Sequence, residues 1–379
     1  MEAWYSNPAA REFRTENESN TALHRFHSQC VPNYSVTPLV NMTPIAQELS
    51  IGHVFLKDES SRLGLPAFKI LGASWAIFNI FCERFGLNLA TATLDDIRDC
   101  CRGTSYTLCA ATDGNHGRAV ARMAALLGLD ARIYVPTCVP IRSRQLIASE
   151  GATVVPIPGD YDETILAARD ACQMEISPNS ILVQDTSWEG YTRIPMQIVI
   201  GYATIFVEID AQLLVQNLPP PSLVVVPVGV GSLAHAAVLH YRSKVRSTSP
   251  SIMTVEPVTA SCLLKSLKAT QPMTISTSNT IMHGLNCGTV SGHAWPDLLR
   301  GVDIATSVAD DEAGKAVRDL QGLGVSSGPC GAATIAALRC LAQYSHVNQN
   351  EPILKLDETS VVIVISSESS EVYLDSLLN

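Results

Sequence analysis

The sequence predicts an α/β fold in which mostly parallel sheets are covered by helices. Short apolar runs of four to six residues suit strands that are buried on both faces. These runs lie at 153–157, 223–228, 252–255 and 361–365. Helical stretches separate them, at 116–127, 141–149, 161–172, 194–214, 233–242 and 331–342. Strands that alternate with helices in this way are typical of a parallel sheet with crossover helices.

The composition indicates a large folded protein. The chain has 379 residues, of which 46% are hydrophobic and 16% are charged. This composition can bury a large core and excludes a mainly disordered chain. Lys and Arg number 26 against 36 Asp and Glu, which gives a net charge of −10. An acidic chain without a basic run is not expected to bind nucleic acid.

The cysteines and the N-terminus favour a soluble, cytoplasmic protein. The 11 cysteines form no Cys-x-x-Cys pair, which argues against a zinc ribbon or a disulfide scaffold. The first residues lack the basic start and apolar stretch of a secretory signal. The most apolar stretch, 223–239, contains Pro227 and is shorter than the roughly 20 residues of a membrane helix. His235 and His240 would lie about 140° apart on a helix, so no metal site is expected.

Lys69 is an isolated cation in the apolar segment 67–73, at the expected start of a helix. A buried lysine has a lowered pKa and becomes a usable amine for Schiff-base chemistry. The alternative is a lysine whose stem covers apolar surface while its ammonium group stays in water.

A second candidate segment, 111–118, reads Ala-Thr-Asp-Gly-Asn-His-Gly-Arg. Asp113 and Asn115 stand beside two glycines at an expected strand-to-helix turn. At such a turn backbone N–H groups are free and side chains can face a cleft. Helix capping by Asp113 or Asn115 is the simpler alternative, but it explains only one of the polar residues.

A third segment, 226–233, reads Val-Pro-Val-Gly-Val-Gly-Ser-Leu. An expected buried strand here ends in a Gly-x-Gly-Ser loop that opens a helix, which suits a bound phosphate group. The loop is not a Walker loop, because no Gly-Lys-Ser/Thr follows. It is not a full dinucleotide fingerprint either, because Ala234 stands where the last glycine would be.

Two further segments carry polar residues next to expected elements. Asp185 precedes a long apolar helix and could serve acid–base chemistry, although helix capping explains it equally well. Ser366 and Ser367 follow the last expected strand. Hydroxyl groups at the carboxyl end of a parallel strand face the usual ligand crevice.

The order of these segments along the chain resembles the fold type II family of pyridoxal-phosphate enzymes, over residues 43–368. The stretches 57–69, 185–204 and 280–288 are similar to the ammonia-lyases of this family that act on 2,3-diaminopropionate. The resemblance implies two lobes, each a mostly parallel sheet covered by helices, with the cofactor in the cleft between them. The large lobe would comprise 1–83 and 206–379, the small lobe 84–205, and the usual state would be a homodimer.

The resemblance also implies the residues that bind pyridoxal phosphate: Lys69, Phe68, Asn115, Gly229, Val230, Gly231, Ser232 and Ser366. Lys69 would form a Schiff base with the cofactor. Asn115 would bond its phenolic oxygen, and the loop 229–232 would hold its phosphate. Ser366, or less readily Ser367, would meet the pyridine nitrogen.

The implied activity is α,β-elimination of ammonia from 2,3-diaminopropionate, which yields pyruvate and two ammonia through an aminoacrylate. Lys69, or Asp113 for the opposite enantiomer, would remove the α-proton. Asp113 or Asp185 would protonate the leaving amine. A serine, threonine or hydroxyaspartate dehydratase, or a β-replacement enzyme, is the alternative with the same cofactor. The non-enzyme alternative is a binding protein that has lost turnover.

The resemblance places Cys262 and Cys287 in two segments that approach the mouth of the site. We hypothesise a disulfide between them.

Overall fold

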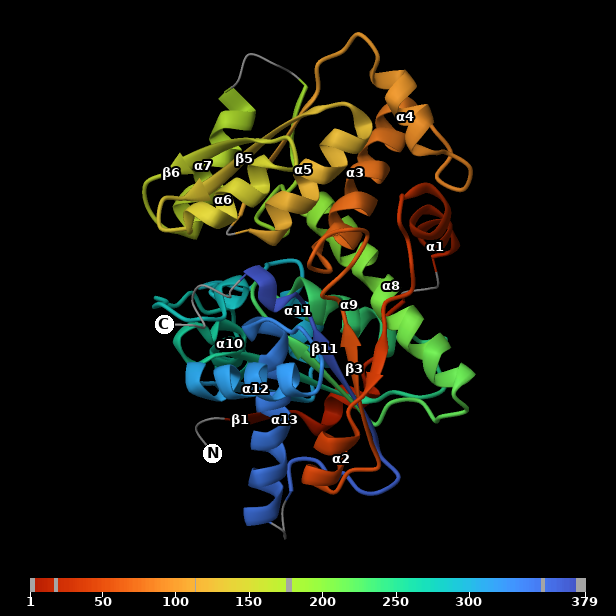
Figure 1. Ribbon diagram of the computed structural model, residues 1–379, viewed down its shortest axis with the longest axis vertical. Helices are drawn as coiled ribbons and strands as arrows, with labels where there is room; N and C mark the ends of the chain where they lie inside the picture. The colour runs from red at the N-terminus through yellow and green to blue at the C-terminus, as the bar shows by residue number, and fades with distance from the viewer. Residues whose placement is uncertain (1–3, 17–19, 113, 175–178, 349–351, 373–379) are drawn as a thin grey trace. The chain divides into compact units, whose positions relative to one another are not determined.

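A computed structural model describes residues 4–16, 20–112, 114–174, 179–348 and 352–372 (Figure 1). The chain forms two compact units. The first unit comprises Met1–Ser19, Val36–Ser61 and Ile205–Asn379, and the second comprises Asn20–Ser35 and Arg62–Thr204. Each unit has its own sheet, so each is described by itself.

The first unit is built on a seven-stranded sheet with the order β1-β10-β9-β8-β11-β3-β2. The strands are β1 (Trp4–Ser6), β2 (Leu39–Asn41), β3 (His53–Asp58), β8 (Leu223–Pro227), β9 (Ser251–Pro257), β10 (Ile304–Val308) and β11 (Val361–Ser366). The two edge strands β1 and β2 run antiparallel to their neighbours, and the five inner strands are parallel. The inner strands are buried almost throughout, as their apolar runs predict.

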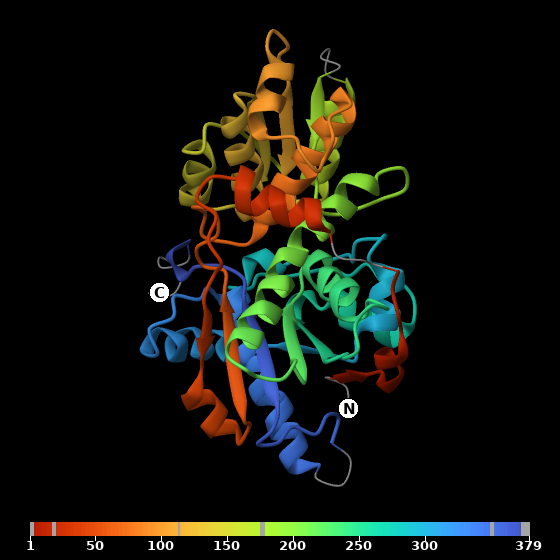
Figure 2. The same ribbon diagram turned by 90° about the vertical axis from the view of Figure 1, so that its right-hand side faces the viewer.

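Helices cover the sheet of the first unit on both faces (Figure 1 and Figure 2). They are α2 (Thr43–Leu49), α9 (Ser232–Tyr241), α10 (Cys262–Ala269), α11 (Trp295–Gly301), α12 (Asp310–Gly322) and α13 (Pro329–Val347). Apolar residues of α2, α12 and α13 share one core cluster with the sheet. The connection from β10 through α12 and α13 to β11 crosses the sheet in one direction, and the β8–α9–β9 connection crosses it in the opposite direction. Because such connections are right-handed, α9 lies on the opposite face of the sheet from α12 and α13.

The second unit has a parallel four-stranded sheet with the order β6-β5-β4-β7. Its strands are β4 (Thr107–Ala111), β5 (Asp130–Pro136), β6 (Thr153–Ile157) and β7 (Ser180–Leu182). Its helices are α1 (Thr21–Arg25), α3 (Lys69–Phe85), α4 (Leu94–Cys101), α5 (Asn115–Leu127), α6 (Ile141–Ala148) and α7 (Tyr161–Met174). Short 3-10 segments of the chain lie at Pro8–Glu12, Val258–Ala260, His283–Leu285 and Ser370–Val372, and a π-helical turn at Phe26–Cys30.

The units differ from the expected lobes in two segments. The residues 20–35 and 62–83 were expected in the large lobe, whereas both belong to the second unit. The physical reason is α3, which is buried along most of its length and contacts α4 and α5 of the second unit. The helix that carries Lys69 therefore packs with the helices of the second unit.

The expected α/β class with mostly parallel sheets is confirmed, and so is each expected strand and helix, within two residues at most ends. The largest difference is α13, which continues to residue 347.

The helix α8 (Arg193–Val215) is long and apolar enough to cross a membrane by length and composition alone. Just over half of its most apolar window, 56%, is buried inside the protein, and Glu208 on it is buried against Lys57. Buried core helices of soluble proteins pass the same test.

Candidate active site

Lys69 is the first residue of α3, and its side chain is 22% exposed. The helix that follows is buried from Ile70 to Phe78, so the lysine stem starts among apolar neighbours. Its Nζ donates a hydrogen bond of 2.6 Å to Oδ2 of Asp185. The ammonium group therefore faces a buried carboxylate within the second unit, which is not the geometry of a lysine that reaches for water.

Asp185 follows β7 and is almost fully buried. Burial raises the pKa of a carboxyl group, but the charges of Lys69 and His116 and the hydrogen bond from Lys69 outweigh it. Together they lower the pKa of Asp185 to about 2. Its other oxygen, Oδ1, lies 3.5 Å from Oη of Tyr161. The carboxylate is thus ionised at neutral pH and contacted on both oxygens.

His116 is a neighbour of Asp185 to which the sequence analysis assigned no role. Its Nε2 bonds the carbonyl oxygen of Val183 at 2.8 Å, and a carbonyl can only accept, so Nε2 carries the proton. Its Nδ1 has no hydrogen-bond partner among the described residues and lies 4.0 Å from Oδ2 of Asp185. Burial lowers the pKa of His116, so the ring is neutral at neutral pH. The sequence feature that could have identified His116 as a site residue is its position after a strand end, at the start of an amphipathic helix.

The turn before α5 places Asn115 as the first helical residue, half-buried. Thr112 caps this helix: its Oγ1 accepts hydrogen bonds from the backbone N–H groups of Gly114 and Gly117, at 2.9 and 3.1 Å. The capping that was considered for Asn115 is therefore done by Thr112, and the side chain of Asn115 is not needed for it. Asp113 lies outside the described residues.

The expected phosphate loop lies in the first unit, between β8 and α9. Gly231 has a φ of +98°, and a Cβ there would come within 2.9 Å of Leu298 Cδ1. A Cβ on Gly229 would come within 2.9 Å of the carbonyl oxygen of Gly284. Gly231 is the N-cap of α9 and provides no side chain to cap it, and Val230 and Ser232 are buried beside it. The backbone at this helix N-terminus fits a phosphate group, which needs close approach and N–H donors.

Ser366 ends β11 in the first unit and is fully buried. Its Oγ donates a hydrogen bond of 2.8 Å to Oγ of Ser327, and its carbonyl oxygen accepts one from the N–H of Glu59. The hydroxyl group is therefore held at the carboxyl end of a central parallel strand, the edge at which ligands of α/β sheets bind. Ser367 is buried next to it.

Cys262 and Cys287 also lie in the first unit, near the phosphate loop. The thiol of Cys262 is 3.9 Å from the carbonyl oxygen of Gly229, and a Cβ on Gly229 would lie 3.2 Å from Sγ of Cys287. None of the eleven cysteines is in a disulfide, so the hypothesised disulfide is not formed in this structure.

No group of three His, Cys, Asp or Glu side chains in the described parts of the chain is arranged to hold a metal ion.

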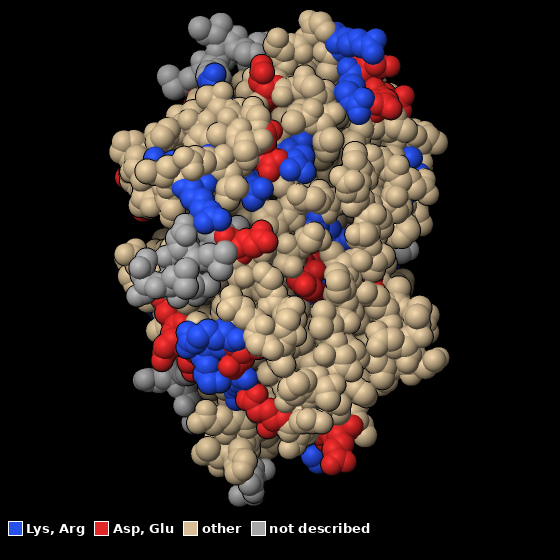
Figure 3. Space-filling view, viewed as in Figure 1, with Lys and Arg blue, Asp and Glu red and all other residues tan. Residues whose placement is uncertain are grey.

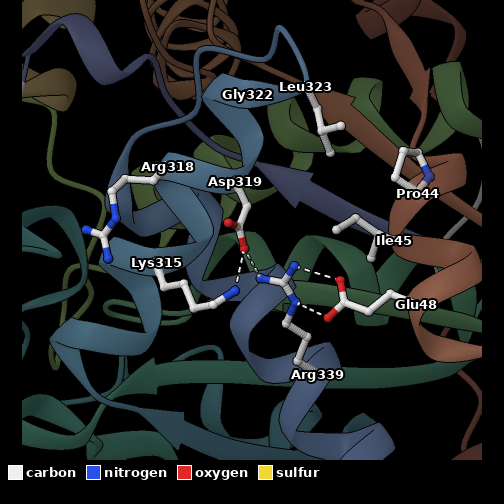
Figure 4. A pocket seen from close by; sticks show the side chains of 9 residues that line it. All are labelled: Pro44, Ile45, Glu48, Lys315, Arg318, Asp319, Gly322, Leu323 and Arg339. Carbon is white, nitrogen blue, oxygen red and sulfur yellow. Dashed lines mark hydrogen bonds and ion pairs between the residues drawn. The ribbon is translucent and has the colours of Figure 1, made fainter.

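A hollow of about 510 Å³ in the first unit lies between α2, α12 and α13, away from every expected site residue of that unit. Charged side chains of both signs gather over α12 (Figure 3). Arg339 bonds Glu48 through two contacts of 2.8 Å and Asp319 at 2.6 Å, and Lys315 bonds Asp319 at 2.8 Å (Figure 4). These four charged side chains form ion pairs with one another. The hollow is therefore lined by a surface ion-pair network.

The family of pyridoxal-phosphate-dependent enzymes matches residues 31–366, which is most of the chain. The chain therefore belongs to this family, and it is an enzyme whose cofactor is pyridoxal phosphate. The amine of Lys69, the glycine loop and the buried Ser366 fit that group as described above.

Within the family, the chain is similar to diaminopropionate ammonia-lyases. It is 34% identical to the enzyme of Salmonella typhimurium over 392 residues, which cover 99% of this chain and 95% of that protein. The structure of diaminopropionate ammonia-lyase from Escherichia coli in complex with D-serine matches with a TM-score of 0.85, at 29% identity and over 99% of this chain and 95% of that one. The same Escherichia coli enzyme in complex with an aminoacrylate–PLP azomethine reaction intermediate matches with a TM-score of 0.84, at 28% identity and with the same coverage. These relatives confirm the fold type II architecture and the expected resemblance.

Proposed function

We propose that the chain catalyses the α,β-elimination of ammonia from 2,3-diaminopropionate, with pyruvate and two ammonia as the final products. The observation that carries this proposal is the ionised, buried Asp185 in contact with Lys69. A carboxylate beside the reactive amine favours a substrate with a β-ammonium group over one with a β-hydroxyl group, since it attracts the former by charge. The likeness to ammonia-lyases over nearly the whole chain supports the same substrate class.

The cofactor would be held by the residues that the sequence analysis named. When bound, pyridoxal phosphate supplies an electron sink for the α-carbon of an amino acid. Lys69 would bond it through Nζ, with Phe68 beside the lysine, and Asn115 would bond its phenolic oxygen. The loop 229–232 would hold the phosphate, and Ser366 would hold the pyridine nitrogen.

Lys69 and Asp185 can divide the proton transfers between them. Lys69 as a free amine takes the α-proton at Nζ, and the Asp185 carboxylate stabilises the resulting ammonium group at 2.6 Å. For the opposite enantiomer, Asp113 would take the α-proton.

Asp185 has the properties of a conditional acid. Beside a charged Lys69 its pKa is about 2, so it holds no proton. Burial is the largest influence on this carboxyl group and acts to raise its pKa. The proton that Lys69 takes from the α-carbon can pass through Asp185 to the leaving β-amino group, which restores the free amine of Lys69; Asp113 is the second candidate for this step. The released enamine takes up water and yields pyruvate and the second ammonia.

The proposal is tested by the ratio of products from purified enzyme with pyridoxal phosphate. Diaminopropionate is expected to yield two ammonia per pyruvate, and serine one. A panel of D- and L-diaminopropionate, serine, threonine and hydroxyaspartate separates the ammonia-lyase from the dehydratase alternative. A β-replacement enzyme would release pyruvate only slowly, and with an added thiol it would form a β-thio-substituted amino acid in place of pyruvate. No pyruvate from either enantiomer of diaminopropionate would refute the proposed function.

We further propose that the enzyme works as a cytoplasmic homodimer whose partner is a small amino-acid substrate, with no nucleic-acid or membrane partner. The reduced thiols and the net charge of −10 support this assignment. Light scattering behind a size-exclusion column tests the dimer: a mass of one chain would contradict it.

A further inference from the structure

A chain of hydrogen bonds leads from the end of β4 to the carboxylate that contacts Lys69. The backbone N–H of Ala111 donates to Oε1 of Gln184 at 3.0 Å. Nε2 of Gln184 donates to Oη of Tyr161 at 2.9 Å, and this hydroxyl group donates to Oδ1 of Asp185 at 3.5 Å. All of these residues belong to the second unit.

The direction of this chain is fixed at each step. A backbone N–H can only donate, so the amide oxygen of Gln184 faces Ala111 and its NH₂ group faces Tyr161. The NH₂ group can only donate, so the Tyr161 oxygen accepts there and its own proton points to Asp185. Gln184 is fully buried, which prevents water from replacing it in this order. Tyr161 is thereby held as a donor towards Asp185.

In this arrangement the two oxygens of the Asp185 carboxylate have different partners. Oδ1 faces the Tyr161 hydroxyl group, and Oδ2 faces Lys69 at 2.6 Å. A donor on Oδ1 resists rotation of the carboxylate and stabilises its charged form.

We propose that Tyr161 and Gln184 are positioning residues that hold the Asp185 carboxylate in the orientation that pairs it with Lys69. Neither is among the residues assigned to the cofactor or to proton transfer above. Only the kinetic consequence of this inference rests on the proposed function. The pairing itself can be measured without substrate or cofactor.

The experiment uses the Tyr161→Phe variant of the full chain, freed of cofactor. Trace acetylation with acetic anhydride at fixed pH is followed at Lys69 by peptide mass spectrometry, with the exposed Lys265 as internal reference. A less firmly held Asp185 leaves a larger fraction of Lys69 as free amine. Lys69 is therefore expected to react about threefold faster, the equivalent of half a pKa unit. An unchanged rate in the folded variant would overturn the inference.

The matched control is Tyr134→Phe. Tyr134 is buried in the same apolar cluster that Tyr161 packs against, and its hydroxyl group bonds Arg132. This control also loses a phenolic hydroxyl from the cluster, but it leaves the Asp185 contacts in place. Its Lys69 rate is expected to stay at the wild-type value; a rise equal to that of Tyr161→Phe would assign the effect to general loosening and overturn the inference.

A second variant tests the order of the chain. Gln184→Met removes the donor to Tyr161 and is expected to raise the Lys69 rate in the same direction. Because the two residues act in series, the double variant should react no faster than Tyr161→Phe alone. Additive effects would contradict the series arrangement.

With diaminopropionate as substrate, Tyr161→Phe should lower kcat more than it raises KM. If the wild type did not turn over diaminopropionate, the proposed function would fail, while the acetylation rates would still decide this inference.

Discussion

Each unit contains a lysine that is paired with a buried carboxylate, and the two pairs have different roles. Lys69 and Asp185 are 2.6 Å apart in the second unit, and Lys57 and Glu208 are 2.7 Å apart in the first. Lys57 is completely buried and gives its three protons to Glu208, Gln212 and the carbonyl oxygen of Thr37. Lys69 stands at a helix start with 22% of its side chain exposed.

The difference teaches what separates a structural lysine from a reactive one. The Lys57 ammonium group donates its three protons to fixed acceptors and has none left for a ligand. Its role is therefore to link β3 to α8. An ammonium group at the start of a helix, with 22% of its side chain exposed, can be reached by a ligand and can leave its carboxylate. A buried carboxylate partner alone does not distinguish the two lysines, whereas the exposure of the lysine does.

The largest expected effect is the loss of activity in Lys69→Ala. Removing the amine that bonds the cofactor and moves the α-proton should lower kcat about 10³-fold or more. The absorbance of the cofactor's lysine linkage should vanish with it, while thermal unfolding stays close to wild type. Product release and the visible spectrum check both points; a spectrum unchanged from wild type would refute the assignment of Lys69.

Lys57→Met should show the reverse pattern. It leaves Glu208 buried without its cation, which is expected to lower the free energy of unfolding by about 3–5 kcal/mol. Activity per folded molecule should remain near wild type at low temperature. Urea unfolding and a kinetic assay on the same preparation measure both. A stable variant with lost turnover would show that Lys57 is not merely structural.

Asp185→Asn separates charge from shape in the reactive pair. The pKa of Asp185 is about 2 in the folded chain against an ordinary value of 3.8, so the ionised form stabilises the fold above pH 4. That stability, about 2 kcal/mol, is lost as the pH falls from about 4 to 2. The variant should therefore lack this part of the acid destabilisation seen in the wild type, and its kcat should fall. Unfolding curves of the cofactor-free proteins between pH 2 and 6 test the sign, and parallel curves would contradict it.

Gly231→Ala probes the phosphate loop of the first unit. The left-handed backbone and the contact with Leu298 leave no room for a methyl group. We expect cofactor affinity to fall about tenfold or more, since backbone strain of this kind costs about 1–3 kcal/mol. A titration of cofactor-free protein with pyridoxal phosphate measures it, and Gly322→Ala, which meets nothing within 4 Å, is the control.

Thr112→Val should have the smallest effect. It removes the hydroxyl group that accepts from the backbone N–H groups at the start of α5, at an expected cost of about 1 kcal/mol in stability. Cofactor binding should change little if Asn115 keeps its place as the first helical residue. A loss of cofactor affinity much larger than the loss of stability would assign Thr112 a direct role.

Much of the fold and the cofactor residues could be predicted from sequence because they depend on local patterns. Apolar runs of strand length fixed the positions of β6, β8, β9 and β11. Glycines around a serine at a strand end indicated the phosphate loop, since no other residue type gives that backbone. The resemblance supplied the roles of Lys69, Asn115 and Ser366 in addition.

Other features could not be predicted from the sequence because they depend on contacts between distant segments. Asp185 looked equally like a helix cap until its carboxylate was found beside Lys69, 116 residues away. The unpartnered Nδ1 of His116 and the donor direction of Tyr161 depend on how β4, β7 and α7 pack, and no local pattern encodes them. The expected lobe boundary differed for the same reason, because the mostly apolar sequence of α3 does not indicate which unit it packs with.

By itself, the sequence determined which elements form, which backbone can approach a phosphate, and which lysine stands alone in apolar surroundings. These properties follow from periodicity, from glycine's missing side chain and from the cost of burying a charge. Only the tertiary structure decided which carboxylate pairs with which lysine, and therefore which lysine is free to react. The physical reason is that an ion pair depends on distance and on the loss of water around both groups, and both are set by packing across the chain.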